Sequence, residues 1–179
     1  MPLSSNDLIV EDGTVIANAN SYATIAFVDS YHGLRANTAW LNATVANKVA
    51  ALVDATAYVD ARWNFIGTRS EETQTLEWPR DDVTDRNGFD QEDIVPLAVK
   101  QATAEYALRA LDGNLMPDPM LDDNGKFILY KREKVGPLEE ETRYSESRGH
   151  RAMRPYPYAD RLIASSGLVV LAAGRVVRG

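Results

Sequence analysis

The clearest pattern in the chain is a helical stripe between residues 45 and 63. Apolar or small side chains recur there at alternating spacings of four and three residues, which places them on one face of an α-helix. Asn42 or Thr44 can cap this helix, because a side-chain oxygen accepts a hydrogen bond from a free backbone N–H. A helix of this length is marginal in water, so its apolar face requires a partner. The stripe consists of Val45, Val49, Leu52, Thr56, Val59 and Trp63.

Two further segments have helical periodicity and supply that partner. A first helix is predicted to begin after a cap at Asn20 or Ser21 and to end at Gly33. A third helix is predicted to open at Pro96, a residue favoured in a first helical turn, and to stop at 112–113. The predicted core of the resulting bundle consists of Tyr22, Ile25, Val28, Val49, Leu52, Val59, Trp63, Ala102 and Tyr106.

The rest of the chain surrounds this bundle. Residues 1–19 are predicted to be an N-terminal arm, and the polar, turn-rich residues 68–93 an acidic loop within the bundle segment 20–112. Residues 113–157 contain two alternating stretches, 127–134 and 138–144, that predict a β-hairpin arm. Residues 158–179 are predicted to form a short helix followed by a C-terminal tail. The predicted fold is mainly α: a small helical bundle with a long β-hairpin arm and extended N- and C-terminal arms.

Charge is distributed unevenly along the chain. The net charge is −7, but residues 1–125 hold eight basic and twenty acidic residues, whereas residues 126–179 hold eleven basic and six acidic residues. The first part therefore carries −12 and the second part +5. An acidic body disfavours tight nonspecific binding of DNA by the whole protein. The basic end predicts docking on a negative partner, which could be a nucleic acid, another subunit or the acidic half of the protein itself.

Candidate chemistry is sparse, and we expect no enzyme, no cofactor and no metal site. The chain has no cysteine, which excludes disulfides, thiolate metal sites and cysteine nucleophiles. Its two histidines, His32 and His150, have no nucleophile motif beside them. Calcium-loop alignments starting at Val83 or Met120 fail at their first and twelfth positions, so residues 68–93 are interpreted as a solvated acidic loop. No apolar run approaches the roughly 20 residues that span a bilayer, and the N-terminus has no signal-peptide order, so we expect a soluble intracellular protein.

Two short stretches combine basic and aromatic residues. Residues 126–134 and 151–161 have the composition of a nucleic-acid-binding surface. The favoured interpretation is a hairpin whose aromatic side chains pack inward and whose lysines protect an exposed edge. The hairpin residues concerned are Phe127, Tyr130, Lys131, Arg132, Lys134, Val135 and Leu138.

The C-terminal tail is both apolar and basic. A small bundle has little core left for such a segment to enter, and an exposed apolar terminus is typical of an interaction surface. We therefore predict a docking function for the tail. The residues concerned are Leu168, Val169, Val170, Leu171, Arg175, Val176, Val177 and Arg178.

Several of these segments, in the same order, resemble a family of small tailed-bacteriophage proteins. These are the head-to-tail connector adaptors, often labelled DnaT-like single-stranded-DNA-binding proteins. The shared motifs run from about residue 20 to residue 164, and the Trp-Pro-Arg and Lys-Val-Gly-Pro motifs are the most specific of them. The matching segments are 20–22, 50–60, 76–80 (LEWPR), 95–100, 104–109, 130–137 (YKREKVGP), 154–157 (RPYP) and 160–162.

The resemblance implies a structural virion protein. Such adaptors form a ring of twelve subunits beneath the portal protein, and the C-terminal segment of related adaptors inserts into the portal. By this resemblance the tail would dock on the portal, the hairpin arm would cross to a neighbouring subunit, and the body would face a downstream neck or tail protein. Genomic DNA would pass through the ring without specific binding. The location would be the head–tail neck of the virion, reached from the host cytoplasm. The alternative is a DnaT-like single-stranded-DNA-binding protein.

Overall fold

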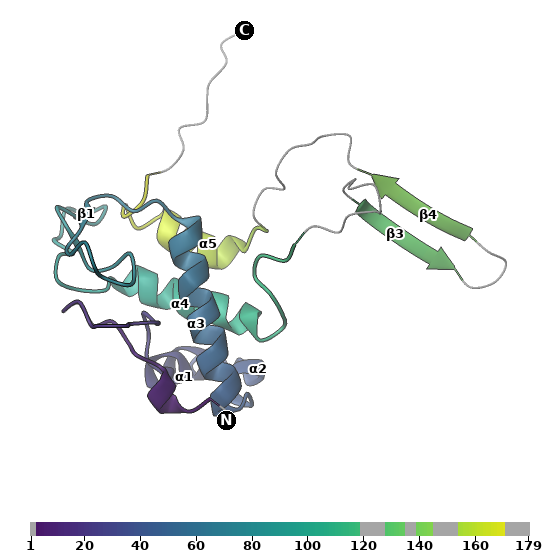
Figure 1. The fold of residues 1–179 in the computed structure, drawn as a ribbon, viewed down its shortest axis with the longest axis horizontal. Helices are drawn as coiled ribbons and strands as arrows, with labels where there is room; N and C mark the ends of the chain where they lie inside the picture. Colours follow the sequence, from purple (N-terminus) through teal and green to yellow (C-terminus); the bar gives the residue numbers. More distant parts are fainter. Residues whose placement is uncertain (1–2, 119–127, 135–138, 145–153, 171–179) are drawn as a thin grey trace, which may run out of the picture. The chain divides into compact units, whose positions relative to one another are not determined.

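The computed structural model describes residues 3–118, 128–134, 139–144 and 154–170 (Figure 1). Contacts along the backbone divide the chain into two compact units. One unit, here called the core unit, comprises residues 1–115 and 155–179. The other, here called the hairpin unit, comprises residues 116–154. Each is described by itself below.

The core unit is helical, which confirms the predicted mainly α class. Helix α3 packs against α4, α4 packs against α5, and α1 contacts both α2 and α4. In Figure 1, α3 crosses α4, and α5 lies at the end of the unit that also holds β1. No helix among the described residues is long and apolar enough to cross a membrane. The helical elements are η1 (Ser5–Asp7), α1 (Ile25–Gly33), α2 (Thr38–Leu41), α3 (Val45–Arg62), α4 (Leu97–Ala110) and α5 (Pro157–Ala164).

Helix α3 forms as its hydrophobic stripe predicts. The Thr44 hydroxyl accepts a hydrogen bond from the Asn47 N–H at 3.2 Å, so Thr44 rather than Asn42 is the cap. The residues in the middle of the stripe are buried in the core, whereas Val45 at its start is 50% exposed. Of the nine predicted core residues, Ile25 and Trp63 are partly buried and the other seven are buried.

Helix α1 begins later than its sequence suggested. Its cap is Thr24, which accepts from the Phe27 N–H, so the prediction of a cap at Asn20 or Ser21 was wrong. Asn20 is engaged elsewhere: its side chain accepts from the Ile9 N–H and donates to the Asp7 carbonyl. Ser21 is buried and its backbone pairs with Val10. Through these hydrogen bonds both residues hold the N-terminal segment against the bundle.

The N-terminal segment packs on the bundle instead of extending away from it. Leu8 and Ile16 pack against the core, and Ala19 is buried within it. Glu11 is also buried, and its carboxylate accepts hydrogen bonds from the backbone N–H groups of residues 13, 15 and 16. These bonds offset the cost of burying a charge and fix the turn that follows.

The loop between α3 and α4 has a buried side that the sequence did not reveal. Strands β1 (Thr68–Arg69) and β2 (Arg80–Asp81) pair within it, and a further antiparallel bridge joins Thr84 to Asp90. Its Trp78, Val83 and Leu76 are buried in the core. The interpretation of a solvated loop therefore holds only for its carboxylates: Glu71, Glu72, Asp81, Asp82, Asp90, Glu92 and Asp93 are exposed.

The hairpin unit contains the two strands that alternation predicted, within one residue at each boundary. Strand β3 (Ile128–Lys134) pairs antiparallel with β4 (Glu139–Tyr144), and the register is irregular between Ile128 and Tyr130. Tyr130, Lys131, Arg132 and Lys134 lie in β3, whereas Phe127, Val135 and Leu138 lie outside the described residues. The predicted crossing of this hairpin to a neighbouring subunit stays a prediction.

Candidate functional site

The start of the predicted docking tail is part of the core. Leu168 and Val169 are buried, and the Leu168 carbonyl accepts from the Ile66 N–H at 3.0 Å. The Val170 N–H donates to the Asn64 carbonyl at 2.9 Å, while the Val170 side chain is 64% exposed. The expectation that the tail has no place within its own subunit was therefore wrong for its first two residues. Leu171, Arg175, Val176, Val177 and Arg178 lie outside the described residues.

A buried polar cluster around Asp160 fastens α5 to α3 and α4. The carboxylate accepts from the Arg62 guanidinium at 2.7 Å, from the Tyr106 hydroxyl at 2.6 Å and from the Tyr156 N–H at 3.0 Å. The rings of Tyr58, Tyr106 and Tyr156 meet edge to face, with centroids 4.9–5.8 Å apart. Burial and the bond to Asp160 raise the pKa of Tyr106, so its hydroxyl remains a donor. The sequence placed these residues in separate segments, so no local signal pointed to the cluster.

The same cluster fixes both ends of the hairpin unit. The Tyr156 hydroxyl donates to the Leu115 carbonyl at 3.0 Å, and both residues are buried. The chain therefore leaves the core unit after Leu115 and returns to it before Tyr156, beside this hydrogen bond. We expect substitutions within the hairpin unit to leave the core unit folded, because the hydrogen bond between Tyr156 and Leu115 already joins the chain on both sides of it.

Most cations of the core unit are engaged within it. Residues 3–115 and 155–170 hold nine basic and eighteen acidic residues. Four cations form ion pairs: Lys48 with Asp29, Arg62 with Asp160, Arg80 with Glu77, and Arg109 with Glu105. Three arginines donate to backbone carbonyls: Arg35 to Tyr31, Arg69 to Gln74 and Arg86 to Ser165. The described part of the core unit thus has few cations available for phosphate groups.

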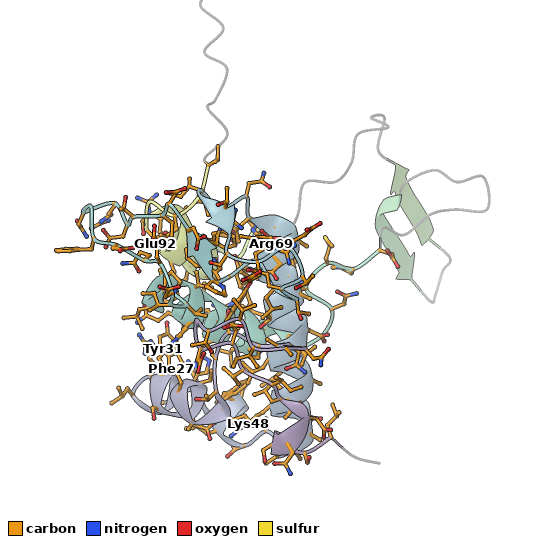
Figure 2. The ribbon with its side chains drawn as sticks, turned by 60° about the vertical axis from the view of Figure 1, so that its left-hand side comes forward. Phe27, Tyr31, Lys48, Arg69 and Glu92 are labelled. Carbon is orange, nitrogen blue, oxygen red and sulfur yellow. The ribbon has the colours of Figure 1, made fainter. Side chains whose placement is uncertain are left out.

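One surface cluster does combine arginine and aromatic groups. The Arg35 guanidinium lies over the Tyr31 ring at 3.5 Å, and Phe27 stacks on Tyr31 with centroids 6.4 Å apart. The Tyr31 hydroxyl donates to Glu105, which also accepts from Arg109. Figure 2 shows Phe27 and Tyr31 side by side on α1. Exposed aromatic and arginine groups can stack on bases, but here Tyr31 is only 6% exposed and Glu105 contributes a negative charge.

Of the two histidines, the structure describes His32. His32 is buried, its Nε2 lies 3.0 Å from the Ala104 carbonyl oxygen and its Nδ1 lies 2.9 Å from the Asn37 amide. Burial lowers its pKa, which favours the neutral imidazole. It is a packed core residue. His150 lies outside the described residues. Among the described residues, no cluster of three or more acidic or histidine side chains can hold a metal ion.

A second buried network joins α3 to the N-terminal segment and to the loop. The Tyr22 hydroxyl donates to Asp60 and accepts from the Glu77 N–H at 3.0 Å, and Asp60 also accepts from Glu77. Burial raises the pKa of Asp60 from 3.8 to about 6. It also raises the pKa of Tyr22, with the Asp60 charge as the second cause, so Tyr22 stays protonated.

We predict that the charge on Asp60 costs stability at neutral pH. Its folded pKa lies above its unfolded value, so between about pH 4 and pH 6 the folded state binds more protons and stability falls as pH rises. Relative to Asp60→Asn, the free energy of unfolding of the wild type should fall by on the order of 2 kcal/mol from pH 4 to pH 7. Urea unfolding across this range measures the difference. Asp54→Asn, exposed on the same helix, is the control, and a constant difference between wild type and Asp60→Asn would contradict the prediction.

An open groove lies at the end of the core unit where α4 begins and α5 ends. Its volume is about 520 Å³. Loop residues 85–87 and 91 form one wall, the first turns of α4 another, and residues 162–168 the third. Its lining includes Arg86, Gln91, Leu97, Gln101, Leu162 and Leu168. Apolar and polar side chains are mixed in it, as in sites that bind a peptide.

The comparisons with known proteins identify a family. The family described as "Putative DnaT-like ssDNA binding protein" matches residues 6–179. The chain belongs to this family. No curated protein and no solved structure matches it. The match covers both the core unit and the hairpin unit.

Proposed function

We propose that this member of the DnaT-like family is a structural subunit of the head-to-tail connector of a tailed bacteriophage. It forms a ring, twelvefold by the resemblance, under the portal and joins the capsid to the neck or tail. Its location is then the neck of the virion. The proposal is supported by the ordered motifs at residues 20–164, which resemble the connector adaptors.

One observation carries the choice of an assembly role over a DNA-binding role. The described part of the core unit is acidic, and seven of its nine cations already bind carboxylates or carbonyl groups of the same unit. Binding to a phosphate backbone requires cations that exchange with counterions. An acidic surface instead repels phosphates, so a genome can pass a ring of such subunits without adhering to it.

The hairpin unit and the C-terminal segment supply the contacts in this proposal. The hairpin unit crosses to a neighbouring subunit, and the tight closure of its ends at Tyr156 and Leu115 supports its use as an arm. The segment 171–179 docks on the portal. Leu168 and Val169 belong to the core, so the portal contact begins beyond Val170.

The second candidate function is single-stranded-DNA binding, which the family description favours. In that case the binding surface includes the basic residues of β3, and the Arg35–Tyr31 cluster offers a further stacking surface. Phosphate contacts would make the affinity fall steeply with salt concentration.

Cosedimentation with the cognate portal tests the proposal. We expect the intact chain to bind, and the chain ending at Val170 to bind at least about 100-fold more weakly, because burial of Leu171, Val176 and Val177 contributes about 1.5 kcal/mol each. Truncation after Val170 leaves the buried Leu168 and Val169 in place, so the core unit should unfold at the same urea concentration as the intact chain.

A matched pair of variants separates the two candidate functions. The triple variant Leu171→Asp, Val176→Asp and Val177→Asp should lose portal binding, whereas Lys131→Glu with Arg132→Glu should keep it. The same proteins are titrated with a labelled single-stranded oligonucleotide at several salt concentrations. Salt-dependent binding that the β3 variant abolishes, with no portal binding by the intact chain, would reject the connector role in favour of DNA binding.

A further inference from the structure

The groove at the start of α4 has a mixed polar and apolar lining, and no described residue occupies it. Leu97 contributes to it although its side chain is 59% exposed. Leu162 and Leu168 also line the groove, and Gln101 brings an amide group that can hydrogen bond to an extended backbone. A leucine kept this exposed at a concave site is typical of a contact surface.

The loop whose residues 85–87 and 91 line the groove is acidic overall, although its charged lining residues are one anion, Asp85, and one cation, Arg86. Between residues 81 and 93 the exposed charged side chains are five carboxylates and one cation, Arg86. The five are Asp81, Asp82, Asp90, Glu92 and Asp93. Figure 2 shows Glu92 at the edge of this loop, on the side away from α3. The groove therefore suits a segment that combines aliphatic side chains with positive charge.

We propose that the groove binds residues 171–179 of a second copy of this chain. That segment, LAAGRVVRG, has three large aliphatic side chains, two arginines and no acidic side chain. Leu171, Val176 and Val177 match the apolar lining residues Leu97, Leu162 and Leu168, and Arg175 and Arg178 match the acidic loop 81–93. Nine extended residues reach at most about 30 Å, which is ample for a groove of this size.

The direction of the chain favours a second copy over the same copy. Leu168 lines the groove, but residues 168–170 run alongside residues 64–66 in an antiparallel pairing. Val169 and Val170 belong to this pairing and do not line the groove, so the described chain has left the groove at Val170, whereas the segment of a second copy can enter it from outside.

The proposed contact is head-to-tail, because the groove of one copy receives the end of the next. Contacts of this kind close into a ring when the rotation between copies permits it and otherwise continue as an open chain. This inference goes beyond the connector role, since it concerns how free subunits associate before any portal is present. Residues 171–179 would then bind first the groove of another copy and later the portal.

Sedimentation velocity of the full-length chain tests the proposal. We expect concentration-dependent self-association that Leu97→Lys weakens at least about tenfold, because the lysine removes apolar contact and repels the arginines. Leu34→Lys is the matched control: Leu34 is 89% exposed, follows α1 and does not line the groove. Circular dichroism melting confirms that both variants are folded.

The segment itself is tested in the same assay. Arg175→Glu combined with Arg178→Glu should weaken association to the extent that Leu97→Lys does, and the free peptide LAAGRVVRG should dissociate the assemblies. A full-length chain that stays monomeric at every concentration, or a Leu97→Lys variant that associates like Leu34→Lys, would overturn the proposal. Portal cosedimentation of Leu97→Lys separates the two ideas, because the connector role requires that variant to bind normally.

Discussion

Replacing Asp160 by asparagine is expected to lower the free energy of unfolding by about 3–5 kcal/mol. Asparagine has nearly the same shape, so packing is retained while the charge is lost. The Arg62 guanidinium, with a side chain only 15% exposed, then keeps a buried charge without its anion. The Tyr106 hydroxyl and the Tyr156 N–H also compete for a single remaining acceptor. Three elements of the core unit therefore lose their common partner.

Equilibrium unfolding in urea measures this effect. The control is Asp112→Asn, which removes an equal charge from an exposed position just past α4. It should change the free energy of unfolding by less than about 0.5 kcal/mol. A loss below about 1 kcal/mol for Asp160→Asn would mean that water or another group replaces the carboxylate, and the cluster would not be the fastening point of α5.

Replacing Gly167 by alanine is expected to lower the free energy of unfolding by about 2–5 kcal/mol. Its φ of +84° lies in the left-handed region, which costs a side-chain-bearing residue about 1–2 kcal/mol. A Cβ there would also lie 2.6 Å from the Arg86 backbone nitrogen and 2.7 Å from its Cα. Either the loop or the end of α5 must move, at an additional cost of about 1–3 kcal/mol. Because Arg86 lines the groove, the groove changes shape as well.

Gly88 provides a matched control for this substitution. Its φ is +82°, but a Cβ there meets nothing within 4 Å. Gly88→Ala should therefore show the backbone cost alone, and the difference between the two variants isolates the clash with Arg86. Thermal and urea unfolding of both proteins give that difference. An equal loss of stability in the two variants would mean that the loop moves away from the added Cβ at no cost. The contact between residues 86 and 167 would then not be rigid.

Contacts within the core unit hold the residues that flank the hairpin unit and residues 171–179. The Tyr156 N–H donates to Asp160 and the Tyr156 hydroxyl to the Leu115 carbonyl, beside both boundaries of the hairpin unit. Leu168 and Val169 are buried, and residues 168–170 pair with residues 64–66. Substitutions in either segment are therefore expected to leave the core unit folded.

Local pattern was sufficient wherever the stabilising partners are close in sequence. The stripe of α3 and its cap at Thr44 need only residues three or four positions apart. The Glu105–Arg109 ion pair on α4 likewise joins residues only four positions apart. The antiparallel pairing of β3 and β4 follows from alternation across a short connection.

Local pattern failed where distant residues compete for the same groups. Asn20 and Ser21 have the side chains of helix caps, but the N-terminal segment takes them, and Thr24 caps α1 instead. Helix α2 has only four residues and no periodicity, and it forms because Trp40 is buried and donates to Asp29. In each case a tertiary contact outweighed the local preference.

The sequence by itself determined the helical class, the main helices, the hairpin strands and the acidic balance of the core, because each depends on neighbouring residues or on composition. Only the tertiary structure decided that Leu168 and Val169 enter the core and that Asp160 joins Arg62 and Tyr106, which lie 98 and 54 positions away. It also decided where the groove lies. Such contacts arise when packed helices bring distant groups together, and burial then makes each unpaired charge or missing apolar contact costly.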